Sequence, residues 1–226
     1  MGKVLTRMKP LGVFAVLLVA ACYEPPETIG LTQDADMLDG RSVGLVFEDG
    51  YTFGLWTHGR SGQWIDVAKF LDAAEIKDPA PEMEAALARQ LVEHTGVKDM
   101  GSPLSFGSKK PDDLVAWARE HAVTDLMIDV ETEEWGLEWW SSSVRYEAVF
   151  RLIDPVSGQT VAQHLCDMKS PELEPGPKTP QNPFPQDEVS RALLVDNAAP
   201  IKAIINNLAE ECVEAVGHAA QLGTQQ

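Results

Sequence analysis

The chain has 226 residues, a length that suits one domain, or one domain with a short appendage. Lys and Arg number 18 against 35 Asp and Glu, so the formal net charge is -17 at pH 7, which excludes a protein that binds nucleic acid by neutralising phosphates. The composition is 44% hydrophobic and 23% charged, which is typical of a globular protein rather than a disordered one.

The first residues are organised like a signal peptide. Lys3, Arg7 and Lys9 make a basic start, and an apolar run follows over residues 11–21. The run is too short to cross a bilayer, which needs about 20 residues. It has the length of the apolar core of a signal peptide. Residues 1–21 are therefore expected to be removed from the mature protein.

Residues 19–22, Val-Ala-Ala-Cys, resemble the lipobox of bacterial lipoproteins. The resemblance implies that diacylglycerol is attached to the Cys22 sulfur, that the chain is cleaved before Cys22, and that the new amino terminus is acylated. In such lipoproteins an acidic residue after the cysteine often marks retention at the inner membrane. Tyr23 stands there instead, which favours a lipid anchor in the outer membrane, facing the periplasm.

One other pattern competes for the amino terminus. Residues 1–6 also fit the loose pattern for N-myristoylation. That interpretation leaves the apolar run and Cys22 without a role, so the lipobox is the better explanation. Residues 22–40, which include Pro25 and Pro26, are predicted to form a tether, and residues 41–226 a single periplasmic domain.

The domain should begin with short strands. Residues 43–47 form an apolar run that suits a buried strand. Asp49-Gly50 lies between this run and residues 51–56, and Asp-Gly between two such runs is a hairpin signal.

A helix should follow after an ambiguous stretch. Asp78 can cap it, Pro79 suits its first position, and Glu82 and Glu84 complement the positive end of the helix dipole. Gly96 is the kind of residue that ends a helix. A second, shorter helix is expected over residues 112–121.

The sheet signal is clearest between residues 126 and 168. Apolar and charged residues alternate over 126–131 and 144–152, and a third strand is expected over 160–168. This alternation predicts an antiparallel sheet that is covered on one face. Asp129 and Glu131 are expected to lie near Arg145 or Arg151 on the charged face.

The chain ends in a proline-rich loop and helices. Residues 170–186 contain six prolines and are predicted to be a stiff surface connection, although they also contain overlapping P-x-x-P patterns. Residues 187–195 should form one helix. A second should begin near Pro200, with Asn197 as a cap, and carry one apolar face.

Two cysteines remain after lipidation of Cys22. Cys212 lies on the apolar face of the last helix, and Cys166 lies in the strand which that helix should cover. An oxidising periplasm favours pairing them. The sequence therefore predicts a structural disulfide between Cys166 and Cys212.

Three tryptophans follow a cluster of acids. Glu131, Glu133 and Glu134 precede Trp135, Trp139 and Trp140. Continuing the strand alternation would bury Glu134 and expose Trp135 and Trp139, so the strand must either bulge or end near residues 133–135. If it ends, the indoles gather at the rim of the sheet, where Trp135, Trp139 and Trp140 would form a partner or glycan site.

The sequence contains no catalytic motif that we recognise. The histidines are scattered, and the acids at Asp34, Asp36 and Asp39 do not match a calcium loop. We therefore predict no catalytic residues, no metal site and no cofactor. Paired carboxylates can hydrolyse glycans, so the cluster at residues 131–134 leaves a cell-wall glycan hydrolase as an alternative.

These patterns predict an α/β fold, a two-layer sandwich of a mixed sheet with an antiparallel hairpin, helices on one face and a long C-terminal helix. Over about residues 80–220 this order resembles the small periplasmic domains of outer-membrane lipoproteins, such as penicillin-binding-protein activators and curli-secretion lipoproteins. The resemblance implies a non-enzymatic lipoprotein that binds or scaffolds a periplasmic protein or cell-wall glycan. A subunit of an oligomeric secretion or assembly apparatus is the other alternative.

Overall fold

The computed structural model describes residues 28–30, 38–46, 53–56, 75–104, 106, 110–181 and 185–222. The predicted signal peptide, residues 1–21, and the predicted lipidation site Cys22 lie outside these residues, as do Asp34 and Asp36. The predicted turn at Asp49-Gly50 also lies outside them.

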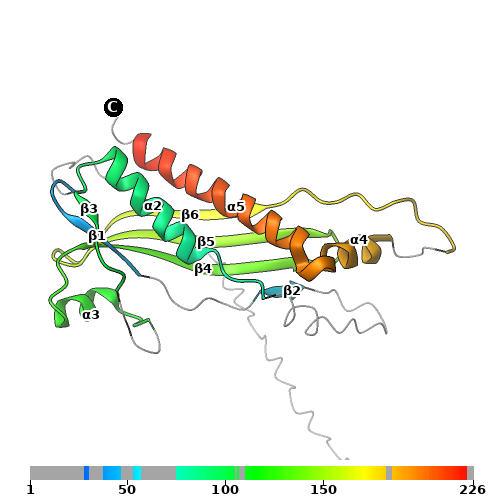
Figure 1. Cartoon of the computed structure of the whole chain (residues 1–226), viewed down its shortest axis with the longest axis horizontal. Coiled ribbons are helices and arrows are strands. Elements are labelled where there is room, and N and C mark those ends of the chain that lie inside the picture. Colours follow the sequence, from blue (N-terminus) through cyan, green and yellow to red (C-terminus); the bar gives the residue numbers. More distant parts are fainter. Residues whose placement is uncertain are drawn as a thin grey trace, which may run out of the picture.

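The centre of the fold is a mixed sheet with the strand order β3-β1-β4-β5-β6 (Figure 1). Strands β4, β5 and β6 are long and antiparallel, whereas β1 is parallel to both of its neighbours. A further strand, β2, pairs with β4. The described strands are β1 (Ser42–Leu45), β2 (Gly54–Trp56), β3 (Asp99–Met100), β4 (Leu126–Glu138), β5 (Ser143–Asp154) and β6 (Gln159–Lys169).

Helices cover one face of the sheet almost completely. The described helices are α2 (Ala80–His94), α3 (Leu114–Glu120), α4 (Pro185–Leu193) and α5 (Val195–Leu222). Helices α2 and α5 lie side by side over the long strands (Figure 1). The α/β class, the mixed sheet and the long C-terminal helix are thus confirmed. None of the helices in the described part of the chain is long and apolar enough to cross a membrane.

Helix α3 departs from the expectation that all helices share one face. It packs in a small second cluster with Val46, Met127 and Ile153. Met127 lies between Leu126 and Ile128, which belong to the main core under α2 and α5. Because successive strand residues point to opposite faces, α3 covers part of the opposite face.

The first two strands do not form the predicted hairpin. Both β1 and β2 are parallel to β4, β1 beside Leu126–Ile128 and β2 beside Gly136–Glu138. Two strands that run in the same direction along one edge cannot be joined as a hairpin. At Gly136 a Cβ atom would overlap the carbonyl oxygen of Gly54, so the pairing of β2 with β4 requires glycine there.

We therefore expect Gly136→Ala to lower the free energy of unfolding by roughly 1–3 kcal/mol, because the added methyl group would force β2 away from β4. Urea denaturation measures this change. Gly176→Ala is the matched control, since a Cβ there meets nothing within 4 Å. Equal effects of the two substitutions would contradict the assigned role of Gly136.

A bulge in β4 decides the position of the tryptophans. The register against β5 shifts between Thr132 and Glu134, after which Trp135 pairs with Tyr146. The strand therefore bulges instead of ending, and Trp135 and Trp139 are 3% and 7% exposed within the main core. The expectation that they project from the rim is wrong for these two indoles. Trp140 is 42% exposed.

The C-terminal helices are tied to the sheet by the predicted disulfide. Residues 196–198 have positive φ angles of 52°, 58° and 54°, which break α5 just before Pro200. Beyond the break, Cys212 bonds to Cys166 of β6, with the Cα atoms 5.7 Å apart. Both cysteines are buried, and the Cα separation lies within the ordinary range for a disulfide.

Removing this bond should destabilise the fold. A cross-link over a separation of 46 residues contributes about 4 kcal/mol on the chain-entropy model. Cys166→Ala and Cys212→Ala should each lower the melting temperature by roughly 10 °C, and the double variant should add little to either. Two free thiols in denatured, unreduced mature protein would show that the bond does not form.

The open face of the sheet carries charges in cross-strand pairs. Arg151 of β5 contacts Asp129 at 3.1 Å and Glu131 at 2.5 Å, as the alternation predicted. Asp129 is 1% exposed and also pairs with Lys110 at 2.9 Å. Arg145 pairs with the acids around it on all three long strands, namely Glu134, Glu147 and Asp167.

Two described parts of the predicted tether contact the domain. Ile29 forms an isolated antiparallel bridge with Gln163 of β6, through two backbone hydrogen bonds of 2.8 Å. Leu38 is 5% exposed and belongs to the main core. The range 22–40 therefore touches the sheet at one point and the core at another.

Candidate functional site

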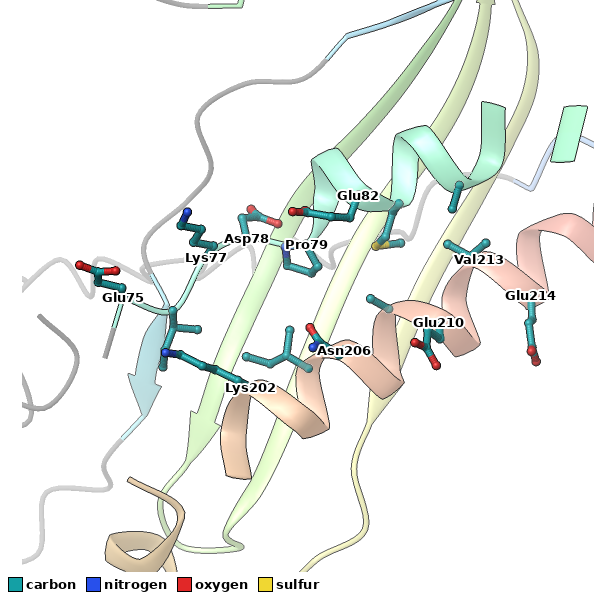
Figure 2. A pocket seen from close by; sticks show the side chains of 15 residues that line it. Glu75, Lys77, Asp78, Pro79, Glu82, Lys202, Asn206, Glu210, Val213 and Glu214 are labelled. Atoms are coloured by element: carbon teal, nitrogen blue, oxygen red, sulfur yellow. The ribbon is translucent and has the colours of Figure 1, made fainter. Parts of the chain in front are cut away.

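A surface groove of about 740 Å³ lies between the start of α2 and the middle of α5. Figure 2 shows that its walls come from the segment before α2, from the first turns of α2 and from α5. Its buried apolar side chains are Met83, Ile205, Ala209 and Val213. These residues form an apolar floor that is open to solvent between two helices.

Small residues explain where the groove lies. Gly217 of α5 faces Gln90 of α2 so closely that a Cβ atom would overlap the Gln90 side chain. The Gln90 side chain therefore occupies the space beside Gly217 between the two helices. Nearer their N-terminal ends, Ala86 and Ala209 line the groove. Their short side chains leave space unfilled between the helices.

The groove has a predominantly acidic rim. Glu82 of α2 and Glu210 and Glu214 of α5 line it and are exposed. Lys202 and Lys77 line the end nearest to the start of α2 (Figure 2). An apolar floor with carboxylates along both helices is suited to a ligand that is itself apolar on one side and positively charged on the other.

A buried polar chain leads from the groove into the core. Asp78 lines the groove and accepts hydrogen bonds from the Ala80 backbone N–H at 2.9 Å and from the Thr132 hydroxyl at 2.8 Å. The Thr132 hydroxyl also lies 3.1 Å from the Tyr146 hydroxyl. Tyr146 is fully buried, and burial raises the pKa of its phenol above its ordinary value. The N-cap residue of α2 is Pro79 rather than the predicted Asp78, but the Asp78 carboxylate accepts from the first N–H of the helix and ties the helix start to β4.

Glu84 has a different role from the one expected. It was predicted to complement the positive end of the helix dipole together with Glu82, but it lies beyond the first turn and its side chain is fully buried against the sheet. Its Oε1 accepts a hydrogen bond of 3.0 Å from the Val130 backbone N–H, while no residue in the described part of the chain donates a hydrogen bond to Oε2. Val130 lies just beyond the stretch of β4 that pairs with β1. Glu84 therefore supplies the acceptor that a neighbouring strand would otherwise provide.

Burial raises the pKa of Glu84 to about 8. The hydrogen bond from Val130 and the charge of Lys110 act in the opposite direction, but desolvation outweighs them. The carboxyl group is therefore largely protonated at neutral pH. Its position on α2, four residues after Ala80 and four before Ala88, is the signal that could have identified it as inward-facing.

This assignment predicts a pH dependence. The folded pKa is higher than the unfolded value near 4.5, so the folded protein binds the proton more tightly and loses stability as pH rises between the two values. From pH 5 to pH 9 the wild type should lose roughly 3–5 kcal/mol relative to Glu84→Gln. Thermal melts of both proteins measure this difference. Parallel melting curves for the two proteins across that range would contradict it.

Two of the acids proposed for glycan hydrolysis are each paired with an arginine. Glu131 pairs with Arg151, and Glu134 pairs with Arg145 at 3.1 Å. Burial alone would raise the pKa of Glu131, but the hydrogen bond from Arg151 and the charge of Lys110 bring it below the ordinary value. A general acid needs the opposite shift. These carboxylates are arranged as cross-strand ion pairs.

The remaining predicted site residues are widely separated. Cys22 lies outside the described residues, and Cys166 and Cys212 form the disulfide. Trp139 is anchored in the core and donates its Nε1–H to Asp187 of α4 at 2.8 Å. Trp140 is the exposed member of the three tryptophans. Within the described ranges, no group of three or more His, Cys, Asp or Glu side chains is placed to hold a metal ion.

Comparisons with known proteins add little to this description. No model of a protein family matches the chain, and no curated protein matches it. Among solved structures, a variant PelC dodecamer from Paraburkholderia phytofirmans matches at 15% identity and a TM-score of 0.32, over 78% of this chain and 95% of that one. A second crystal form of the PelC dodecamer gives 15% identity and a TM-score of 0.31, over 78% and 94%. Likenesses at this level assign no function to the chain.

Proposed function

We propose that this protein is a lipid-anchored periplasmic lipoprotein of the outer membrane with a non-enzymatic binding role. The observation that carries the binding role is the groove between α2 and α5. Its lining combines an apolar floor with carboxylates and lysines at the rim. Such a lining supports recognition of a partner through apolar contact and charge.

The compartment is supported by two independent features. The Val-Ala-Ala-Cys sequence at residues 19–22 is the one expected of a lipoprotein processing site. The buried disulfide between Cys166 and Cys212 is of the kind that persists in an oxidising compartment. The periplasm satisfies both requirements. Two or three acyl chains at Cys22 would hold the domain firmly, although the protein is strongly acidic.

The occupant of the groove is proposed to be a basic amphipathic segment of a periplasmic protein. An apolar side chain occupies roughly 100–150 Å³, so a groove of about 740 Å³ holds several anchoring side chains of a peptide. The exposed carboxylates of Glu82, Glu210 and Glu214 would then face the lysines or arginines on the outer side of that peptide. Apolar contacts would supply affinity, and the carboxylates would set orientation.

Adjacent glutamates on α5 provide a matched test of this proposal. Glu210 lines the groove, whereas Glu211 is exposed on the same helix but does not line it. A fluorescein-labelled amphipathic peptide of leucine and lysine, about 18 residues long, serves as the probe in fluorescence anisotropy titrations. Glu210→Lys should weaken its binding by roughly five- to tenfold, which corresponds to about 1 kcal/mol or slightly more.

Glu211→Lys changes the net charge of the protein by the same amount and should weaken binding by less than about twofold. Equal weakening by both substitutions would mean that the peptide responds to overall charge, and the groove proposal would fail. Equal binding of a matched peptide of leucine and glutamate would contradict the assigned role of the acidic rim.

A further inference from the structure

We propose that one end of the sheet rests on the membrane surface, with Trp140, Leu173 and Val195 in the interfacial layer of the lipid. We call these three residues the apolar end. The inference rests on the proposed lipid anchor at Cys22 and extends it from attachment to orientation. The proposed ligand of these three residues is a lipid surface, and none of the three lines the groove.

Hydrogen bonds gather the apolar end around α4. The Gln186 side chain donates to the Leu173 carbonyl at 3.5 Å, and the Ser142 hydroxyl donates to the Gln186 carbonyl at 3.3 Å. The Ser190 hydroxyl donates to the Trp139 carbonyl at 2.7 Å. Helix α4 thus joins the turn that carries Trp140 to the chain leaving β6. Val195 is the first residue of α5, two residues after the end of α4 and just before the break at residues 196–198.

The three apolar side chains of the apolar end are substantially exposed to solvent. Trp140 is 42% exposed, Leu173 41% and Val195 52%. Tryptophan is enriched where a membrane meets water, because its ring is apolar and its N–H is polar. Two other exposed apolar residues, Met100 and Val156, lie at the opposite end of the sheet. Exposure alone therefore does not choose between the two ends.

The direction of the chain at Ile29 makes that choice. Ile29 pairs antiparallel with Gln163 of β6, so the described segment 28–30, followed toward its amino terminus, points to the C-terminal end of β6 at Lys169. The turn that carries Trp140 and the chain that leads to Leu173 lie at that end. The anchor at Cys22 would therefore be on the same side of the molecule as the apolar end.

The lengths agree with this direction. Cys22 precedes Ile29 by seven residues, and Lys169 follows Gln163 by six. At about 3.3 Å per extended residue, both segments span roughly 20 Å. Pro25 and Pro26 disfavour helix in this segment. A tether continued along β6 would place the lipidated cysteine level with the end of that strand.

Charge explains why the contact needs the anchor. The net charge of -17 gives the domain no electrostatic attraction to lipid, and three partly exposed apolar residues form a small surface. Such a contact is weak in free solution. Once the acyl chains hold the domain at the membrane, its effective concentration there is high and a weak contact can set its orientation.

Depth-dependent quenching in vesicles tests the orientation. The full-length lipidated protein is reconstituted in phosphatidylcholine vesicles that contain a nitroxide-labelled lipid. Trp140→Cys and Val156→Cys are each labelled with bimane, and both sites are exposed, at opposite ends of the sheet. We expect the fluorescence of the label at position 140 to fall by about half or more, and that of the label at position 156 to change little.

Intact mass and vesicle flotation are measured on the same samples, with the thermal melt of each variant as a check on folding. If the acylated protein floats and the two labels are quenched equally, or neither is quenched, the orientation is wrong while the lipid anchor stands. Stronger quenching at position 156 would reverse the orientation. Protein that lacks acyl mass and does not float would overturn the lipid anchor, and the orientation with it.

Discussion

The bulge in β4 between Thr132 and Glu134 decides which side of the sheet every later residue of that strand faces. Before the bulge, Leu126, Ile128 and Val130 point to the helices. Without it, the alternation would bury Glu134 and expose Trp135 and Trp139. The extra residue reverses the alternation, so the indoles enter the core and Glu134 meets Arg145 on the charged face. Both faces of the long sheet depend on this one irregularity.

Two different kinds of contact hold the helical layer on that sheet. Helix α5 is bonded covalently to β6 through Cys166 and Cys212. Helix α2 is held by polar groups that are buried with it, with Asp78 bonded to Thr132 and Glu84 bonded to the edge of β4. A neutral Glu84 suits this position because a buried carboxylate with one unpartnered oxygen is costly. The groove lies between these two helices, and both of its walls are therefore held to the sheet.

The proposed sites occupy different parts of the molecule. The groove lies over the helical face, whereas the apolar end lies where β6 finishes and α4 begins (Figures 1 and 2). If the apolar end rests on lipid, the groove remains accessible from the periplasm. The acidic surface keeps the rest of the domain from binding anionic lipid. Anchoring and partner recognition can then take place at the same time without competing for one surface.

Local sequence patterns by themselves determined the α/β class, the three long antiparallel strands, the last helix and the pairing of Cys166 with Cys212. The first three follow from alternation or helical spacing within a short stretch of chain, and the disulfide follows from two cysteines on elements expected to face each other in an oxidising compartment. The sequence also predicted an irregularity near residues 133–135, because burial of Glu134 would have been costly. It could not decide whether the strand bulges or ends there. The lipid anchor at Cys22 remains a prediction from the sequence.

Only the tertiary structure decided the contacts between distant segments. The parallel pairing of β2 with β4 depends on Gly136, and Glu84 is buried against a stretch of β4 that no strand pairs with on that side among the described residues. The position of the groove depends on how α2 and α5 lie beside each other, with the Gln90 side chain against Gly217 at one end and the small residues Ala86 and Ala209 in its lining. Local periodicity shows which face of an element is apolar, but not which other element covers it or how much space remains between them.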